Sequence, residues 1–428
     1  MSIMMVGDVR QTLYGWRNAR WDLVANFDKI LDKVKYGSIL KNYRSPKQLV
    51  TLSNLFGEGF KEFINEVESS DPHHPKGDNV LAINGFEDSY GEISWVTKRV
   101  KELRNNGISL SEIAILSRSN DFLLNIEGSF IAEKIPYVVK FDSRSVLNQS
   151  PFRWVYAMLS ILVNPFDAMA FADTFKPIKG FGPKYIDGIK KAYLDQQRTN
   201  TKKAEVFDFF ISYIGNARGN KQAQMAKLFF DSILLPVRDF HRSNYSFNPL
   251  IKYIAALQEK LVAFEDDRDP KPIMVKIKRE QMYKVFRTMF SIYGVSLEDY
   301  EFSSMSETER FLYIYQALQL SQGSYDRDRD KKKAGEDIDS VMLSTIHSFK
   351  GLQKDFIFYV NAQPLMPMSP NSFEDRCVFY VAVTRSKKHL CVTYSNLTLG
   401  YDNRLRPSGK NPYMDEYISF VKQLTGRS

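Results

Sequence analysis

The spacing of apolar positions changes along the chain, and this change divides the sequence into regions. Between residues 79 and 140, short apolar runs of about four to eight residues, typical of buried strands, alternate with longer amphipathic stretches. The predicted strands are 79–85, Ile113–Leu116 and Pro136–Lys140, and the predicted helices are 89–107, which stops at Gly107, and 120–134. Strands that alternate with helices predict parallel β-α-β units.

Strand-like runs almost vanish between about residues 150 and 330. Long amphipathic stretches such as SPFRWVYAMLSILVN (150–164) and KQAQMAKLFFDSILLPVRDF (221–240) predict a helical region there. The segment 321–340 is dense in charge and poor in apolar residues, which predicts a linker or mobile loop that contacts water or nucleic acid.

The alternating pattern resumes after residue 340. It predicts strands at 341–347, 355–361 and 390–394, and a helix at 373–389. The chain therefore predicts an α/β domain that is interrupted by a helical insertion. The opening run MSIMMVG (1–7) has the composition of a buried strand that ends in a loop.

Composition narrows the class of protein. The 428 residues are 43% hydrophobic, enough for two or three domains with buried cores. The net charge of +9 favours an acidic partner such as nucleic acid or an anionic membrane surface, although a merely basic surface would give the same value. The two cysteines, Cys377 and Cys391, have no pairing pattern, and no apolar run approaches the roughly 18 residues needed to span a bilayer. We therefore expect a cytoplasmic protein without a membrane segment.

Four stretches carry the candidate chemistry: GDVRQTLYGWRNA (7–19), NYRSP (42–46), STIHSFKGLQ (344–353) and FYVAVTRSKKHL (379–390). Taken singly, each allows an ordinary interpretation. Gln11 can cap a turn. Tyr14 and Trp16 suit a core, although the arginines around them, such as Arg17, favour stacking on bases.

The remaining candidates are cations and their neighbours. Arg44 can form a surface ion pair or bind a phosphate with two hydrogen bonds. Arg385 lies within an otherwise apolar predicted helix, where an arginine is costly unless a phosphate or a carboxylate pairs with it. Thr345, His347 and Lys350 lie where a predicted strand meets a loop and helix, a common place for phosphate contacts.

In this order, the four stretches resemble the later motifs of superfamily 1 DNA helicases of the UvrD/PcrA/Rep type. They are similar to that family's VGD-x-x-Q-S-I-Y-x-[FW]-R-G-A, N-Y-R-S, T-x-H-x-x-K-G-L-E and Y-V-A-x-T-R-A segments. IAILSRSN (113–120) resembles its A-I-L-x-R-x-N strand, and KGFGP (179–183) lies where relatives have a Gly-hydrophobic-Gly turn, although a plain turn between helices explains that pair as well.

The resemblance implies an α/β fold of the RecA-like, P-loop NTPase type, with a parallel sheet and a large inserted helical domain. Residues 1–35 would be the end of a first RecA-like domain. Residues 36–165 and 336–428 would form the second RecA-like domain, and 166–335 the insertion.

The resemblance also implies roles for individual residues. Gln11, Arg44 and Arg385 would act on the γ-phosphate of ATP, the two arginines as arginine fingers, while Tyr43 would stack on adenine. The implied DNA contacts are Tyr14, Trp16, Arg17, Arg118, Asn120, Gly180, Gly182, Thr345, His347 and Lys350.

Two features depart from the family pattern. Gln353 stands where the family has a Glu that contacts the nucleotide ribose, and a Gln accepts hydrogen bonds without carrying charge. The sequence also contains no G-x-x-x-x-G-K-[ST] segment, which cradles the phosphates and helps to hold Mg²⁺.

These features together predict the C-terminal part of an ATP-dependent 3′→5′ DNA helicase that acts on single-stranded DNA and single-strand/duplex junctions. ATP and Mg²⁺ would be its cofactors, and the metal ligands would lie on a P-loop-containing subunit supplied by another chain. The alternative is a helicase remnant that binds DNA or protein without ATP hydrolysis. A nuclease is disfavoured, because no cluster of carboxylates with a lysine is evident.

Overall fold

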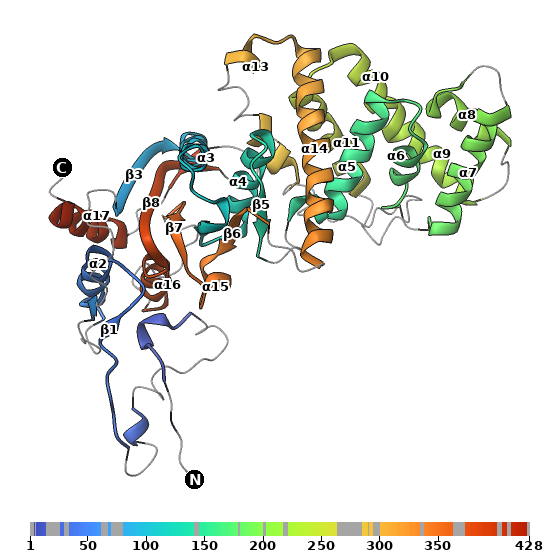
Figure 1. The fold of residues 1–428 in the computed structure, drawn as a ribbon. Helices are drawn as coiled ribbons and strands as arrows, with labels where there is room; N and C mark the ends of the chain where they lie inside the picture. The colour runs from blue at the N-terminus through green and yellow to red at the C-terminus, as the bar shows by residue number, and fades with distance from the viewer. Residues whose placement is uncertain are drawn as a thin grey trace.

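The computed structural model gives the fold of most of the chain (Figure 1). The residues that it describes are 4, 6–13, 26–29, 34–60, 67–69, 80–140, 145–178, 180–199, 203–216, 221–262, 285–289, 291–293, 300–333, 338–362, 373–399, 405–408 and 412–425.

A seven-stranded sheet forms the centre of the first unit, which we call the sheet unit. Its order is β3 (Leu81–Asp88), β8 (Ser386–Leu399), β7 (Lys354–Tyr359), β4 (Ile113–Ser117), β6 (Val341–Thr345) and β5 (Tyr137–Val139), all parallel, with β9 (Leu405–Pro407) antiparallel to β8. Every residue of β4 is buried, as its apolar sequence predicts for a central parallel strand. β1 (Lys41–Asn42) and β2 (Glu68–Ser69) form a separate parallel pair.

Helices cover both faces of this sheet, and each face has its own hydrophobic core. On one face lie α3 (Ser89–Asn105) and α4 (Asn120–Ala132); on the other lie α2 (Lys47–Gly57), α16 (Phe373–Val383) and α17 (Pro412–Thr425). Asp88 and Ser119 cap α3 and α4 by accepting hydrogen bonds from the amides of Gly91 and Phe122. The parallel sheet and its two helical layers confirm the predicted RecA-like α/β class.

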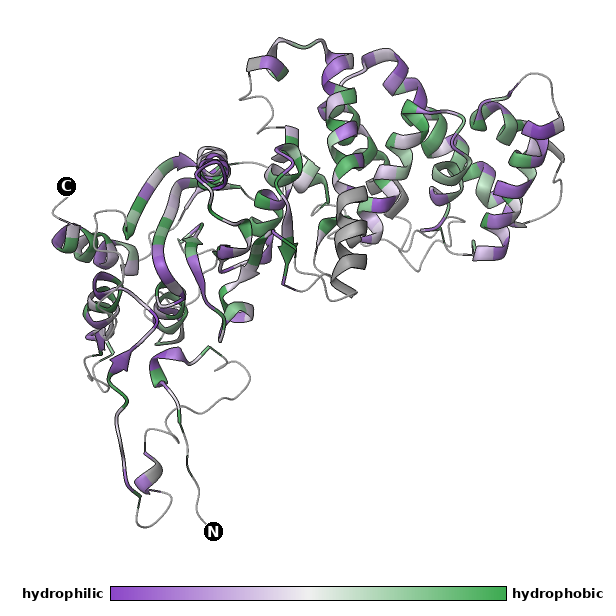
Figure 2. Ribbon diagram, viewed as in Figure 1, coloured by the Kyte–Doolittle hydropathy of each residue, from purple (hydrophilic) through white to green (hydrophobic). Residues whose placement is uncertain are grey.

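The second unit is helical and lies beside the β5 edge of the sheet, opposite α2 and α17 (Figure 1); we call it the helical unit. Its helices share one large core, and Figure 2 shows hydrophobic residues concentrated where they face one another. They are α5 (Ser150–Val163), α6 (Ala168–Asp173), α7 (Pro183–Thr199), α8 (Val206–Asn216), α9 (Lys221–Phe229), the π-helical η7 (Phe230–Leu234), α10 (Leu235–Asn244), α11 (Phe247–Val262), α13 (Tyr300–Ser304) and α14 (Glu307–Lys333). α5 also packs in this core. The domain boundaries expected from the sequence stay predictions.

A buried carboxyl marks the passage from one unit to the other. Glu127 of α4 accepts hydrogen bonds from the Tyr137 hydroxyl (2.9 Å), the Ser145 hydroxyl (2.5 Å) and the Val146 amide (3.1 Å), just before the short helix η6 (Val146–Asn148). Burial raises the pKa of Glu127 to about 7, although these three hydrogen bonds act in the opposite direction.

Residues 285–289 and 291–293 pack directly against the sheet unit at this seam. A Cβ on Gly128 would lie 2.7 Å from the Thr288 carbonyl oxygen, so only glycine permits the approach. The Ser291 hydroxyl donates to the Asn125 carbonyl (3.0 Å), and Arg287 donates to the Leu399 carbonyl at the end of β8 (2.6 Å).

Three expectations about local structure are wrong. Residues 321–333 continue α14 rather than forming a loop, because arginine and lysine sustain a helix that the apolar residues before them have started. Ser386–His389 belong to β8 rather than to the preceding helix. At the N-terminus, the described residues 4 and 6–8 form no strand, and Met4 and Val6 are exposed.

Among the described residues, no helix is long and apolar enough to cross a membrane.

Candidate active site

Two arginines converge at one place on the sheet unit. Arg44 follows β1, in a loop where the Asn42 side chain accepts hydrogen bonds from the amides of Arg44 (2.8 Å) and Ser45 (3.0 Å). Arg385 lies between α16 and β8. Both reach Thr384: Arg44 Nη1 donates to its carbonyl oxygen (3.1 Å), and Arg385 Nη2 donates to its hydroxyl (2.8 Å).

Residues near the N-terminus hold Arg385 from the other side. Gln11 lies in η1 (Val9–Gln11), a short helix capped by Asp8, which accepts from the Arg10 amide (3.0 Å). The Gln11 side chain donates to Asp8 (3.1 Å) and accepts from Arg385 Nη2 (3.4 Å). Arg385 Nε also donates to the Val381 carbonyl (2.9 Å), so its side chain is fixed on two sides.

The two guanidinium groups have no carboxylate partner among the described residues. Asp8 pairs with Arg10 instead (2.9 Å). Burial, and then the charge of Arg44, lower the pKa of Arg385 to about 10, whereas Tyr380 and Asp8 act in the opposite direction. Burial also lowers the pKa of Arg44, against the effect of Tyr380. Because Arg385 is only 2% exposed, its uncompensated charge favours the binding of an anion at this place.

Gln353 and Tyr43 lie at the rim of the same cluster. Arg44 Nε donates to Gln353 Oε1 at 2.5 Å, across 309 positions of sequence. Tyr43 is 74% exposed, which leaves its ring free to stack on a ligand. The structure therefore brings Gln11, Arg44, Gln353 and Arg385 together, with Tyr43 next to Arg44.

The candidate DNA contacts Thr345, His347 and Lys350 lie at the end of β6 and in and after α15 (Ile346–Phe349). Lys350 Nζ donates to the Gln11 carbonyl oxygen (2.8 Å), so this loop contacts the same short segment that holds Arg385. Burial, and then the charge of Arg118, lower the pKa of His347, although a hydrogen bond with the Leu13 backbone acts in the opposite direction. Thr345 uses its hydroxyl to cap α15 by accepting from the Ser348 amide (3.3 Å).

The other candidate DNA contacts lie outside this cluster. Arg118 forms an ion pair with Asp375, and Asn120 is the first residue of α4. Gly180 and Gly182 lie in the helical unit before α7, where Gly180 has a left-handed backbone (φ +92°) and a Cβ on either would meet open space. Tyr14, Trp16 and Arg17 lie outside the described residues.

Comparison with known proteins decides the family. The model of the "UvrD-like helicase C-terminal domain" family matches residues 38–397. The chain belongs to this family.

The curated relatives of this UvrD-like chain are helicases. It is 24% identical over 412 residues to the "probable DNA helicase II homolog" of Mycoplasma capricolum, an alignment that covers 92% of the chain and 51% of the relative. "DNA helicase II" of Escherichia coli is 24% identical over 419 residues (95% and 54%), and "ATP-dependent DNA helicase PcrA" of Leuconostoc citreum is 23% identical over 437 residues (95% and 52%). The chain spans about half the length of the curated relatives it matches.

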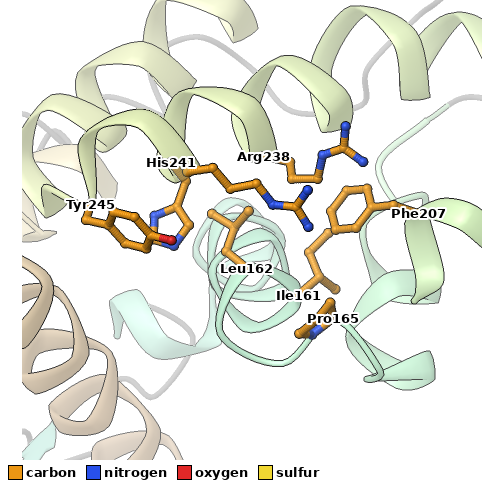
Figure 3. A pocket seen from close by; sticks show the side chains of 8 residues that line it. Ile161, Leu162, Pro165, Phe207, Arg238, His241 and Tyr245 are labelled. Atoms are coloured by element: carbon orange, nitrogen blue, oxygen red, sulfur yellow. The ribbon is translucent and has the colours of Figure 1, made fainter. Parts of the chain in front are cut away.

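The UvrD-like domain also has a pocket of about 100 Å³ in its helical unit (Figure 3). α10 supplies Arg238, His241 and Arg242 to its lining, opposite apolar residues from the end of α5. Arg238 pairs with Asp239 (2.9 Å) and Arg242 with Glu205 (3.0 Å), and burial, then Arg242, lower the pKa of His241 to about 4. Ligand pockets usually measure about 300–1,000 Å³, so this one is too small for a nucleotide.

Sequence reasoning missed several residues that shape the arginine cluster in this UvrD-like domain. Thr384 contacts both guanidinium groups, and the Arg10 guanidinium lies over the Tyr380 ring (5.0 Å to its centre). Thr384 and Tyr380 belong to the motif FYVAVTRSKKHL (379–390), and this is the sequence feature that could have identified them as part of the site. A backbone carbonyl that serves as acceptor, as at Thr384, leaves no trace in a sequence.

Proposed function

We propose that this chain supplies the arginine fingers and single-strand contacts of an ATP-dependent 3′→5′ DNA helicase, and that a P-loop domain outside these 428 residues completes the ATP site. The observation that carries the proposal is the convergence of Arg44 and Arg385 without a carboxylate partner among the described residues. The family and the helicase relatives support it.

At the nucleotide, the proposal assigns the γ-phosphate to Arg44 and Arg385. Guanidinium groups match phosphate oxygens in geometry and charge, and they stabilise the charge that develops in phosphoryl transfer. Their fixed positions suit this task, because donors that are already in place need no reorganisation during the reaction. Tyr43, exposed beside Arg44, would stack on the adenine, and Gln353 would lie near the sugar.

Mg²⁺ fits this chain poorly. The described residues contain no group of three or more His, Cys, Asp or Glu side chains that could hold a metal ion. We therefore assign the ligands of the Mg²⁺ that accompanies ATP in phosphoryl transfer to the P-loop domain, and no step on this chain depends on it.

Gln11 would couple nucleotide to DNA. Its side chain contacts Arg385 and its carbonyl oxygen accepts from Lys350, so a shift of the guanidinium at the phosphate would reach the loop of Thr345, His347 and Lys350. We propose that this loop binds phosphates of the single strand, and that Tyr14, Trp16 and Arg17, which follow Gln11, lie along its bases.

We propose the remaining DNA contacts at positions outside the arginine cluster. Arg118 and Asn120 would touch the same strand from the end of β4, and Gly180 and Gly182 would let backbone amides approach duplex phosphates at a junction. Residues 36–165 and 336–428 would act as the second RecA-like domain, 166–335 as its insertion, in a cytoplasmic enzyme.

The test is DNA-stimulated ATP hydrolysis by this chain assembled with its P-loop domain, whether that domain lies on the same polypeptide or on a second one. We expect hydrolysis that requires both parts and single-stranded DNA, and translocation in the 3′→5′ direction. Salt-sensitive DNA binding that ATP leaves unchanged, together with no hydrolysis by the assembly, would instead support a binding module without ATPase activity.

A further inference from the structure

Gln353 holds Arg44 through a neutral acceptor. The Nε of Arg44 donates to Gln353 Oε1 (2.5 Å), and its Nη1 donates to the Thr384 carbonyl (3.1 Å). Neither acceptor carries charge, so the guanidinium keeps its full positive charge while two of its nitrogens are fixed. Its Nη2 has no protein acceptor among the residues that the structure describes.

The local backbone gives Gln353 this position. Gly351 adopts a left-handed conformation (φ +90°), and the Leu352 amide donates to the Phe349 carbonyl (2.9 Å), which closes the turn between α15 and β7. Gln353 follows that turn and is exposed at the rim of the cluster. The same loop carries Lys350, which bonds the Gln11 carbonyl, so it fixes both the segment of Gln11 and the side chain of Arg44.

A carboxylate at position 353 would have the opposite effect on charge. Hydrogen bonds between a guanidinium and a carboxylate are roughly twice as strong as neutral ones and cancel the charge that a ligand would use. An anionic ligand would then compete with this internal partner for Arg44. With glutamine, the side chain keeps the same acceptor geometry without that competition.

We propose that Gln353, as a neutral acceptor, leaves Arg44 an uncompensated cation, and that the cluster therefore selects a polyphosphate, the triphosphate tail of a nucleotide, over ligands of lower charge. This proposal rests on the proposed function of Arg44 and Arg385. It adds how their site would distinguish between anionic ligands of different charge. It predicts binding that weakens steeply with salt, because two charges with little competition from the protein contribute to it.

The experiment titrates inorganic tripolyphosphate, and separately inorganic phosphate, into the 428-residue chain by calorimetry at several salt concentrations. Gln353→Glu keeps an acceptor at the same place and adds one negative charge. Gln353→Ala removes the acceptor and adds none. Gln319→Glu, at an exposed position of α14 in the helical unit, is the matched control for the charge change.

We expect Gln353→Glu to weaken tripolyphosphate binding about tenfold and to flatten its salt dependence, since a carboxylate competes for Arg44. Gln353→Ala should stay within about threefold of the parent, since Arg44 keeps its charge, and Gln319→Glu within about twofold, since it adds only a distant, screened charge. A Gln353→Glu variant that binds like the parent, or a Gln353→Ala variant that loses as much as Gln353→Glu, would overturn the inference.

A double variant separates this inference from the proposed function. If Arg44→Ala with Arg385→Ala abolishes tripolyphosphate binding while Gln353→Glu changes nothing, the arginine site stands and the role of Gln353 fails. If the parent chain does not distinguish tripolyphosphate from phosphate, this inference fails, while DNA-stimulated ATP hydrolysis by the assembled helicase still decides the proposed function.

Discussion

The protein contains two pairs of arginines that differ in whether a carboxylate balances the positive charge of each side chain. We call Arg44 and Arg385 the sheet-unit pair, and Arg238 and Arg242 the helical-unit pair. Each member of the helical-unit pair has a carboxylate partner, at 2.9 and 3.0 Å, and Arg238 lies over the Phe207 ring (5.1 Å). The sheet-unit pair contacts neutral acceptors on Thr384, Gln353 and Gln11. The two pairs therefore differ in whether their charge is compensated, and this difference is the basis for proposing an anion site at the sheet-unit pair.

The pairs also arise in different ways. Arg238 and Arg242 are four positions apart on α10, so any helix formed by that stretch brings them together. Arg44 and Arg385 come from segments that are far apart in the sequence, and they meet only when the fold is complete. Holding two cations together without a carboxylate partner costs desolvation free energy, which supports the proposed anion site.

The largest effect is expected from Arg385→Ala. DNA-stimulated kcat of the assembled helicase should fall about 10³-fold, because a finger that stabilises the transition state is lost. Arg385→Lys should restore little, since an ammonium cannot reproduce the planar fork. Steady-state ATPase measurements and a thermal unfolding curve for each variant check this. A folded Arg385→Ala enzyme with parental kcat would remove the distinction between the two pairs.

Arg44→Ala should reduce kcat about 10²-fold, less than Arg385→Ala, because Arg44 is half-buried and water can partly replace it. The double variant with Arg385→Ala should be little worse than Arg385→Ala alone if the two act on one phosphoryl group. Strict additivity of the two losses in a double-mutant cycle would show independent roles.

Lys350→Ala removes the hydrogen bond to the Gln11 carbonyl and a candidate phosphate contact. We expect the DNA concentration for half-maximal ATPase stimulation to rise about tenfold, while kcat at saturating DNA changes less, because the sheet-unit pair is intact. Titration of single-stranded DNA in the ATPase assay measures both quantities. An unchanged half-maximal concentration would argue against coupling through Gln11.

Glu127 extends the comparison to a buried acidic side chain. Its pKa of about 7 lies above the usual glutamate value, so the neutral form stabilises the folded protein. That stability is fully present below about pH 4.5 and is lost as the pH rises through 7, by about 1 kcal/mol per pH unit. Glu127→Gln should flatten this dependence in urea unfolding measured from pH 5 to 8. An identical slope in parent and variant would contradict it.

The smallest effect is expected from Arg242→Ala. It removes an ion pair with Glu205 that is half exposed on the arginine side, and such pairs contribute about 0–1 kcal/mol. ATPase activity should stay within twofold of the parent. A loss comparable to that of Arg44→Ala would mean that the helical-unit pair also serves the reaction.

Much of the sheet unit was predictable because its strands depend on local composition. The apolar run of β4 and the caps of α3 and α4 are properties of adjacent residues. The end of α16 was not predictable, because Ser386–Leu390 pairs with β7 and this tertiary pairing overrides a helical pattern. The order of the motifs identified Arg44 and Arg385 as candidate site residues. The hydrogen bond between Arg44 and Gln353, however, joins residues 309 positions apart, and no local sequence pattern predicts it.

β8 gives the arrangement a mechanical consequence. Its 14 residues span roughly 45 Å of extended, hydrogen-bonded backbone, which is stiff along its length. Arg385 directly precedes one end, and at the other the Leu399 carbonyl accepts from Arg287 of the segment that seats the helical unit. A displacement of β8 at its Arg385 end would therefore act on the hydrogen bond between Arg287 and Leu399, where the helical unit packs on the sheet.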